Sequence, residues 1–325
     1  MDAVKVLVLG AAGMIGARLV RRLLADGSLR GQAIAQLTCF DVVEPDHAHG
    51  SIAVENVAGD VADFGMCRDL VAERPDVIFH LAAIVSGQAE AEFELGYRIN
   101  LDGTRHLFEA IRLAGDDYRP RVVYASSIAV FGAPYPEGPI PDDYHLTPLT
   151  SYGTQKAIGE LLLNDYTRRG YLDGVGLRFP TIVVRPGKPN AAASGFFSGI
   201  IREPLAGQPS NLPVGRDVKH WFASPRAAVD FAIRAAEIDG EAVGPHRNLT
   251  MPGVPATTGE ELETLRRVAG DDAVALVTHE PDETIAAIVA GWPQEFEASR
   301  ATRLGFRAEP DFETIVRAYI EDEMG

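Results

Sequence analysis

A tyrosine and a lysine four residues apart are the first candidates for chemistry in this chain. Tyr152 and Lys156 lie in Ser-Tyr-Gly-Thr-Gln-Lys-Ala-Ile-Gly-Glu-Leu-Leu-Leu, a segment with helical periodicity, which places both side chains on one face of a helix. A free phenol with a pKa of about 10 is a poor base near neutrality, but a neighbouring ammonium group favours its ionised form. Tyr152 is therefore predicted to accept a proton from a substrate hydroxyl, with Lys156 in support.

A serine at the end of a predicted strand completes the candidate reaction centre. Ser127 stands in Tyr-Ala-Ser-Ser-Ile-Ala-Val-Phe-Gly, upstream of Tyr152. Its hydroxyl can hydrogen-bond a substrate oxygen that is becoming a carbonyl. A Tyr and a Lys at this spacing also occur by chance on surface helices, so the pair alone is weak evidence. Ser-Ser at a strand end, then a proline-rich loop, then Ser-Tyr-x-x-x-Lys is a much more specific pattern.

Three glycines directly after the first predicted strand indicate a phosphate site. Gly10, Gly13 and Gly16 follow the apolar run Val4–Leu9 and open a predicted helix over 17–25. Glycines let such a turn tighten and let its backbone approach a pyrophosphate, while the helix N-terminus supplies amide donors. The alternative is a tight turn that binds nothing.

An aspartate at the end of the second predicted strand favours NAD over NADP. Asp41 follows the apolar run 37–40, the place where a carboxylate accepts hydrogen bonds from the adenosine ribose hydroxyls. The same carboxylate would repel the additional phosphate of NADP, and no arginine follows it directly. The sequence therefore predicts NAD as the cofactor.

These residues require strands that end at one edge of a sheet. Short apolar runs alternate with longer amphipathic segments, which predicts strand-helix repeats and a parallel sheet. The strands are apolar almost throughout, as expected when helices cover both faces. The predicted fold class is α/β, a Rossmann-type doubly wound parallel sheet with a smaller, discontinuous substrate-binding lobe. The predicted strands are Val4–Leu9, 37–40, 76–83, 121–125, 175–184 and 248–251.

The pattern changes after residue 184 and indicates a second part of the molecule. Residues 185–225 are rich in Pro, Gly, Asn and Ala and contain one amphipathic piece, whereas helices are predicted at 226–237 and from Thr258 onward. The expected division is a Rossmann NAD-binding domain over 1–184, with 226–252 returning to it, and a smaller substrate-binding lobe made from 185–225 and 253–325.

Composition narrows the classes of partner. The chain of 325 residues has 30 basic and 46 acidic side chains, a formal net charge of −16, so its overall field repels nucleic acid and anionic membranes. The two cysteines, Cys39 and Cys67, are far apart, and neither they nor His47 and His49 suggest a metal site. No signal peptide or membrane-spanning run is recognisable. We expect a cytoplasmic protein that uses no metal and binds neither nucleic acid nor membrane.

The spacing Gly-x-x-Gly-x-x-Gly, taken with Ser-Tyr-x-x-x-Lys, resembles the extended short-chain dehydrogenase/reductase family. Gly-Asp-Val at 59–61, His-Leu-Ala-Ala at 80–83 and Asn100 match further motifs of that family. The resemblance implies that Ser127 is the catalytic serine, that Lys156 also holds the nicotinamide ribose, and that Asn100 helps to hold a water in a proton path.

The resemblance also implies a set of cofactor contacts. The segment 59–61 would contact adenine and the backbone of 81–83 would line the cofactor, although Asp60 could instead cap a helix and His80 is expected to be a satisfied strand-end histidine. Ser126 is expected to line the cofactor rather than react. The implied contacts are Gly10, Gly13, Met14, Ile15, Gly16, Asp41, Asp60, Val61, Leu81, Ala82, Ala83, Asn100, Ser126, Tyr152, Lys156 and Pro180.

Two longer stretches, 151–166 and 178–204, resemble sugar-acid dehydrogenases within this family. That resemblance implies NAD-linked oxidation of a four-carbon sugar acid at its 2-hydroxyl. Arg185, Lys188 and Asn190 follow the strand nearest the expected nicotinamide position, so one of them could bind a carboxylate. Both cations could equally be solvated loop charges. The expected substrate contacts are Ser86, Ser127, Tyr152, Arg185, Lys188 and Asn190, and His220 and Trp221 could close the lobe over the site or belong to the core.

Two other functions remain open. Dehydratases of this family place Thr and an acidic residue where this chain has Ser127 and Ile128, so elimination of water is disfavoured. Nucleotide-sugar epimerases share the Ser-Tyr-Lys set, although no basic cluster here is obviously devoted to a diphosphate. A non-catalytic NAD sensor would share the glycine turn but typically lacks the Tyr-Lys pair.

A homodimer is also expected from the family, and Leu161 to Leu163 would suit its interface, although burial within one chain explains them equally well.

Overall fold

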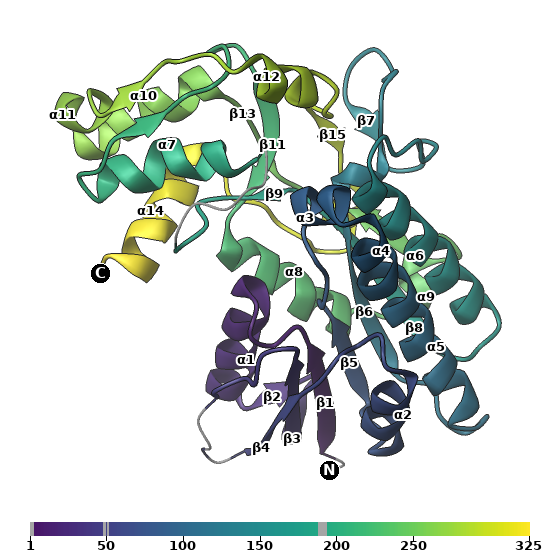
Figure 1. Cartoon of the computed structure of the whole chain (residues 1–325). Helices are drawn as coiled ribbons and strands as arrows, with labels where there is room; N and C mark the ends of the chain where they lie inside the picture. The colour runs from purple at the N-terminus through teal and green to yellow at the C-terminus, as the bar shows by residue number, and fades with distance from the viewer. Residues whose placement is uncertain (1–2, 48–49, 51, 188–193) are drawn as a thin grey trace.

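The computed structural model describes residues 3–47, 50, 52–187 and 194–325. One mostly parallel sheet organises the chain, and its strands follow the order β12-β8-β6-β5-β1-β3-β2, with β4 also paired to β3 (Figure 1). Only β2 runs antiparallel to its neighbour. The strands are β1 Val4–Leu9, β2 Ser28–Leu29, β3 Gln32–Asp41, β4 Ala53–Ala58, β5 Val77–His80, β6 Arg121–Ser127, β8 Asp173–Phe179 and β12 Asn248–Thr250.

Helices cover both faces of this sheet, and an apolar core fills each side. One core packs the sheet against α1 and α8, and the other packs it against α2, α5 and α6. These helices are α1 Met14–Asp26, α2 Phe64–Ala72, α5 Gly103–Leu113, α6 Ser151–Arg168 and α8 Pro225–Glu237. The predicted α/β doubly wound class is confirmed.

The order of the strands creates a switch point between β1 and β5. From β1 the chain builds β3 and β4 on one side, and then it crosses back to build β5, β6, β8 and β12 on the other. In such folds ligands bind outside the carboxyl ends of the strands at this point. The glycine turn follows β1 and His80 ends β5, so the predicted cofactor motifs meet there.

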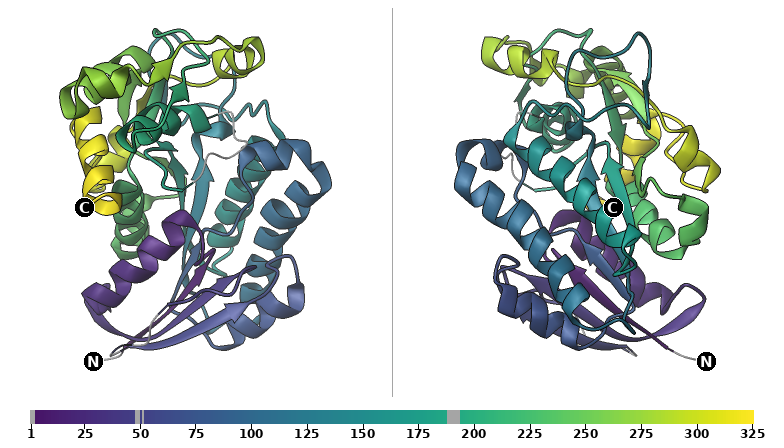
Figure 2. Two further views of the ribbon diagram at one scale, coloured as in Figure 1. Left: turned by 60° about the vertical axis from the view of Figure 1, so that its left-hand side comes forward. Right: turned by 90° about the vertical axis from the view of Figure 1, so that its right-hand side faces the viewer.

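A second lobe lies over the carboxyl ends of the sheet, as Figures 1 and 2 show from several sides. Its centre is a small sheet in which β11 pairs with β13 and with β9, and helix α7 packs on the same apolar core. Its elements are β9 Thr181–Ile182, α7 Gly195–Leu205, β10 Ser210–Asn211, β11 Lys219–Ala223, β13 Val254–Thr257, α10 Thr258–Ala269, α11 Asp271–Val274, β14 Val277–Thr278, α12 Glu283–Ala290 and α14 Phe312–Glu323.

Shorter elements connect the two parts. The proline-rich loop after β6 contains β7 Ile140–Pro141, which pairs with β15 Phe296–Glu297. The other short elements are α3 Ser86–Ala91, α4 Phe93–Gly96, the π-helix η1 Tyr97–Asp102, the 3-10 helix η2 Ile128–Val130, α9 Gly240–Val243 and α13 Ser299–Arg303. Ala301 and Phe306 pack in the core beside α1 and α8 although they lie late in the chain. The domain boundaries given above remain a prediction.

The elements differ from the sequence expectations in a few places, each with a physical reason. The strand expected over 175–184 is divided, because Pro180 has no N–H for a sheet ladder. The amphipathic strand β4 was missed because Val54 alone among its residues is buried. Within α6, Leu161 is exposed and Leu163 is buried, so the segment offers one apolar side chain to a partner rather than three.

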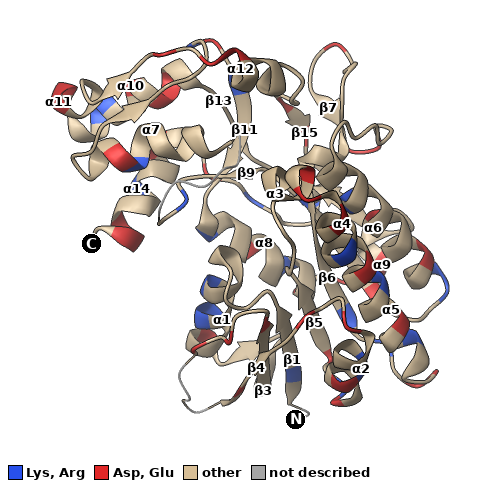
Figure 3. Ribbon diagram, in the orientation of Figure 1, with Lys and Arg blue, Asp and Glu red and all other residues tan. Residues whose placement is uncertain are grey.

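Charge is concentrated on the helices. Figure 3 shows acidic and basic residues side by side on the helices around the sheet, whereas its strands are mostly uncharged. Charged side chains buried near the ends of the strands, such as Lys156, Glu160 and Arg178, therefore stand out as candidates for function. Within the part of the chain that is described, no helix is long and apolar enough to cross a membrane.

Candidate active site

The glycine turn is packed too closely to carry side chains. The N–H groups of Gly10 and Ala11 donate to the Phe40 carbonyl, at 2.8 and 3.1 Å. Gly10 has φ +91°, and a Cβ there would lie 2.7 Å from the backbone nitrogen of Ala82. A Cβ on Gly16 would lie 2.0 Å from the Gly10 carbonyl oxygen. Glycine is therefore required at both positions, and the turn delivers the N-terminus of α1 to the switch point.

Asp41 ends β3 at the lip of this turn. Its Oδ2 accepts the Ala12 N–H at 2.9 Å and its Oδ1 accepts the Val42 N–H at 2.7 Å. These bonds fix the carboxylate, and each oxygen retains a lone pair for a ribose hydroxyl. The predicted contacts Gly13, Met14 and Ile15 form the beginning of α1 beside it.

Asp60 lies at the next loop but already has an ionic partner. Its Oδ1 accepts the Ala62 N–H at 2.9 Å, and its Oδ2 pairs with Arg98. Burial alone would raise the pKa of Asp60, but the bonds from Arg98 and Ala62 lower it, so the group is ionised at neutral pH. Asp63, and not Asp60, caps α2, since its side chain accepts the Gly65 N–H. The neighbouring Val61 is buried.

The segment after β5 forms the opposite wall of the switch point. The Leu81 N–H donates to the Leu9 carbonyl at 2.9 Å, and Ala82 touches the glycine turn, while Ala83 is exposed. His80 is buried, and burial together with the Lys156 charge lowers its pKa to about 3. His80 is thus a neutral structural histidine, with its Nε2 at 2.9 Å from Thr104 Oγ1.

Asn100 is buried, and its amide is committed to protein groups. Its Oδ1 accepts the Ile84 N–H at 2.9 Å, and its Nδ2 donates to the Ile84 carbonyl and to Gln155 Oε1. It thereby fixes the segment after β5 against α6. A role for Asn100 in holding a water remains a prediction, and the structure gives its nitrogen two protein acceptors already.

Tyr152, Lys156 and Ser127 meet at the carboxyl end of β6. Lys156 Nζ donates to the Ala125 carbonyl at 2.7 Å and lies 5.7 Å from the centre of the Tyr152 ring. Thr150 Oγ1 caps α6 by accepting the Gly153 N–H at 3.0 Å, so Tyr152 lies in the first turn of the helix. The three residues predicted to react are therefore brought together by one helix and one strand.

The environment of these groups alters their acidity. Burial raises the pKa of Tyr152 to about 12, while a hydrogen bond with Ser127 and the charge of Arg185 oppose that rise. Burial lowers the pKa of Lys156 to about 7. Tyr152 therefore needs additional positive charge nearby before it can act as a base at neutral pH.

Arg185 is held in the site and is not a solvated loop charge. Its Nε donates to the Ile182 carbonyl at 2.9 Å and its Nη2 donates to Ser194 Oγ at 3.2 Å. Its backbone N–H donates to Ser198 Oγ, and Arg202 donates to its carbonyl. Helix α7 thus fixes the backbone of Arg185, and the Arg185 charge opposes the rise in the pKa of Tyr152. Lys188 and Asn190 lie outside the described residues.

Ser86, His220 and Trp221 are the remaining candidates for the substrate side of the site. Ser86 begins α3 and is half-buried, and Glu90 of the same helix accepts the Ser151 N–H at 2.9 Å, which ties α3 to the start of α6. Trp221 is buried, and its Nε1 donates to the Met251 carbonyl. His220 is buried in the second lobe and stacks on Phe197, so both aromatic side chains belong to cores.

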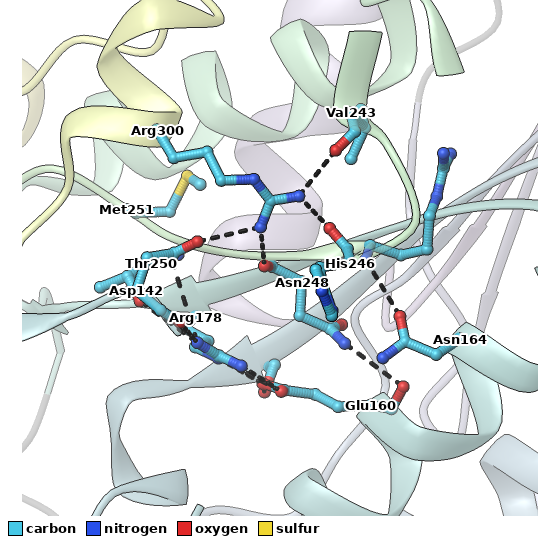
Figure 4. A network of polar contacts seen from close by, with 12 residues as sticks. Asp142, Glu160, Asn164, Arg178, Val243, His246, Asn248, Thr250, Met251 and Arg300 are labelled. Atoms are coloured by element: carbon cyan, nitrogen blue, oxygen red, sulfur yellow. Dashed lines mark hydrogen bonds and ion pairs between the residues drawn. The ribbon is translucent and has the colours of Figure 1, made fainter. Parts of the chain in front are cut away.

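A buried polar network holds the site from behind, and Figure 4 shows most of its members. Arg178 donates from Nε and Nη2 to Glu160, at 2.9 and 2.8 Å, and from Nη1 to the Asp142 carbonyl at 2.7 Å. Asp142 Oδ2 in turn accepts Arg300 Nη1 at 2.9 Å. The network joins α6, β8 and the proline-rich loop to α13, so it fixes the helix that bears Tyr152.

Ser126 belongs to this network. Its hydroxyl donates to Glu160 Oε1 at 2.6 Å, so that oxygen can only accept a hydrogen bond from any further partner. That Ser126 lines the cofactor remains a prediction. Glu160 and Arg178 were missed as site residues. Their signals were a charge inside the otherwise uncharged run 174–179 and an acid one helical turn after Lys156. Pro180 lies buried just beyond β8.

The residues present fit a dinucleotide. The turn at Gly10 and Gly16 has no room for a Cβ, and the start of α1 faces the switch point. Asp41 ends β3, where its carboxylate could accept a hydrogen bond from a ribose hydroxyl. These are the donors and acceptors that a pyrophosphate and an adenosine ribose require.

Comparison with known proteins agrees with this geometry. Residues 6–227 match the family described as "NAD dependent epimerase/dehydratase family". The chain is 48% identical over 321 residues to D-erythronate dehydrogenase of Cupriavidus necator, covering 98% of both chains. It is 38% identical over 320 residues to D-erythronate dehydrogenase of Haemophilus influenzae, covering 98% of this chain and all of the relative. A solved structure named as the nucleoside-diphosphate-sugar epimerase from Agrobacterium tumefaciens superposes with a TM-score of 0.97 and 59% identity, covering 100% of this chain and 96% of that one.

Proposed function

The chain belongs to the NAD dependent epimerase/dehydratase family, and from that premise we propose that it is an NAD-dependent dehydrogenase of a small sugar acid. The proposed reaction oxidises the 2-hydroxyl of D-erythronate to give 2-dehydro-D-erythronate. Two relatives of nearly equal length are D-erythronate dehydrogenases, which supports this substrate.

The observation that carries the proposal is a fixed cation, Arg185, whose charge acts on the Tyr152 phenol. In a 2-hydroxy acid the carboxylate is attached to the carbon that is oxidised, so a cation must lie close to the base that takes the hydroxyl proton. The backbone of Arg185 is held by α7, and its charge opposes the rise in the pKa of Tyr152 that burial causes. A planar guanidinium can bind a carboxylate through two hydrogen bonds. We assign Arg185 as the carboxylate anchor.

Three residues of the chain have separate roles in the proposed oxidation. When bound, NAD supplies the hydride acceptor and a positively charged ring. Tyr152 takes the proton from the 2-hydroxyl at its phenolic oxygen, Ser127 hydrogen-bonds the same substrate oxygen, and Lys156 keeps positive charge beside the phenolate. The C2–H bond breaks with its electron pair and the O–H proton goes to Tyr152, so the product is a 2-keto acid.

A nucleotide-sugar epimerase is the second candidate, because one structural relative at 59% identity carries that name. The trio of Ser127, Tyr152 and Lys156 serves either reaction. An epimerase must also bind a nucleoside diphosphate, which carries two phosphate charges and a base outside the reacting sugar. A sugar acid needs only one anchor for a single carboxylate, and Arg185 meets that requirement.

The test is NADH formation from NAD, followed by absorbance, with D-erythronate, L-threonate and aldonates of four to six carbons. UDP-glucose is assayed in parallel for epimerisation. We expect turnover of D-erythronate above all others. Arg185→Met should raise KM for the acid about 10- to 100-fold, since a charge-assisted hydrogen bond contributes about 1.5–3 kcal/mol. Arg317→Met on the outer face of α14 is the matched control. Epimerisation without net NADH would move the assignment to the second candidate.

A further inference from the structure

Thr181 and His220 form a buried pair that the proposed reaction does not use. Thr181 begins β9, directly after Pro180, and its Oγ1 lies 2.6 Å from His220 Nε2. The other ring nitrogen of His220, Nδ1, lies 3.0 Å from the Pro293 carbonyl. His220 is buried and stacks on Phe197 with an interplanar angle of 4°, so its ring cannot turn freely.

The partners of the imidazole determine where its proton lies. A carbonyl oxygen can only accept, so Nδ1 of His220 must carry the hydrogen. Burial, together with the charge of Arg185, lowers the pKa of His220 to about 4, although the Pro293 carbonyl opposes this. His220 is therefore neutral at physiological pH, and its Nε2 has only a lone pair. It follows that the Thr181 hydroxyl donates its hydrogen to Nε2.

This arrangement fixes the polarity of Thr181. A hydroxyl that has given its one hydrogen to His220 has only lone pairs to offer to anything else. Thr181 is half-buried, so the residue is not sealed inside the core like His220. Any further partner must be a donor, such as a substrate hydroxyl. A carboxylate or a carbonyl oxygen would be repelled.

Thr181 also lies at the right end of the sheet. Phe179 pairs with Ser127 in the register of β8 and β6, and Thr181 follows two residues later, about 7 Å further along the chain. The side chain of Arg185 donates to the carbonyl of Ile182, the residue next to Thr181, and its charge acts on both Tyr152 and His220. Figure 1 shows β9 between the main sheet and the second lobe, above the carboxyl ends of the strands.

We infer that Thr181, oriented by His220, accepts a hydrogen bond from a substrate hydroxyl other than the one that is oxidised, and so selects polyhydroxy acids over simple 2-hydroxy acids. This inference rests on the proposed function, since it concerns the carbons beyond C2 of the same substrate. Ser127 and Tyr152 handle the reacting oxygen and Arg185 handles the carboxylate, while Thr181 recognises the remaining chain. Thr181 is a specificity residue, and His220 is its positioning residue.

The test combines variants of the enzyme with variants of the substrate. Steady-state kinetics of the full-length enzyme with saturating NAD are measured for D-erythronate and for its 3-deoxy and 4-deoxy analogues. Thr181→Val removes the hydroxyl at nearly constant shape, Thr181→Ser keeps it, and Thr302→Val on the exposed face of α13 is the control. Thermal unfolding of each variant separates lost recognition from lost folding.

The Thr181 hydroxyl should strengthen substrate binding only when the substrate carries the hydroxyl that Thr181 recognises. Thr181→Val should raise KM for D-erythronate about 10-fold, with kcat changed less than about 3-fold. One of the two deoxy analogues lacks the hydroxyl that Thr181 binds, and for it wild type and Thr181→Val should have the same KM within about 2-fold. Thr181→Ser should have a KM for D-erythronate close to that of wild type. Equal losses for D-erythronate and both analogues would overturn the role of Thr181 while leaving the proposed reaction intact. A wild-type enzyme that oxidises none of the three acids would overturn both.

Discussion

Around the main sheet, the buried carboxylate of Glu160 receives hydrogen bonds from Ser126 and Arg178, whereas in the second lobe the equally buried Glu261 has no partner among the described residues. Burial raises the pKa of Glu261 well above its ordinary value, because an unpaired charge is costly in the protein interior. The sheet half thus uses buried charge to position reactive groups, and the second lobe holds a carboxyl group that must stay protonated. The comparison shows that hydrogen-bond partners decide whether a buried carboxyl group can stay ionised.

The largest expected effect concerns the sheet half, where we place the chemistry. Tyr152→Phe removes the proton acceptor and keeps the ring, so kcat for D-erythronate should fall by about 10²- to 10⁴-fold. NAD affinity, measured by calorimetric titration, should change less than about 3-fold, because the glycine turn and Asp41 lie at the other end of the site. Retained turnover would show that Tyr152 is not the base. Tyr166→Phe, further along α6, is the control and should keep its turnover.

The next effect tests whether the paired network supports the site. Glu160→Leu leaves Arg178 buried without its hydrogen-bonded carboxylate, with Asp142 3.9 Å away as the next one, and the free energy of unfolding should fall by about 3–5 kcal/mol. Adding Arg178→Met removes the second charge and should recover most of that loss, since an apolar pair of similar volume replaces the ion pair. Denaturant unfolding of the two variants and the wild type measures both numbers. If the double variant were no more stable than the single one, the pairing would not explain the network.

The smallest effect concerns the second lobe and depends on pH. The folded-state pKa of Glu261 is raised above the unfolded value of about 4.5, so the wild type loses stability as pH rises from there to the folded pKa. The loss is at most about 1.4 kcal/mol per pH unit in that window. Glu261→Gln cannot ionise, so it should match the wild type near pH 4.5 and be more stable at neutral and alkaline pH.

Denaturant unfolding at several pH values checks this expectation. Glu263→Gln, two residues away on the exposed face of α10, is the matched control and should leave the pH dependence almost unchanged, because solvent screens that side chain. Identical pH profiles for wild type and Glu261→Gln would mean that Glu261 is not buried and unpaired in solution, and the contrast between the two halves would then fail.

Much of the fold could be predicted from the sequence because its signals are local. The run Val4–Leu9 followed by three glycines, and the apolar runs ending at Asp41 and Ser127, predict strands whose ends converge. Local patterns could not place Glu160 against Arg178, because the partners of a buried charge come from other elements. They also could not distinguish a solvated Arg185 from one held by α7, since Ser198 and Arg202 reach it only after the second lobe has folded.

The sequence by itself determined the chemistry that is available here. Glycine spacing, a strand-end carboxylate and a helical Tyr-x-x-x-Lys are read from residues that are neighbours along the chain, and their geometry follows from the backbone of one turn or one helix. Only the tertiary structure decided which groups share an environment. It set the acidity of Tyr152 and Lys156 through burial, and it brought Thr181 to His220 by pairing β9 with β11. The reason is physical, because desolvation and hydrogen-bond partnership depend on every element that packs around a group, however distant in sequence.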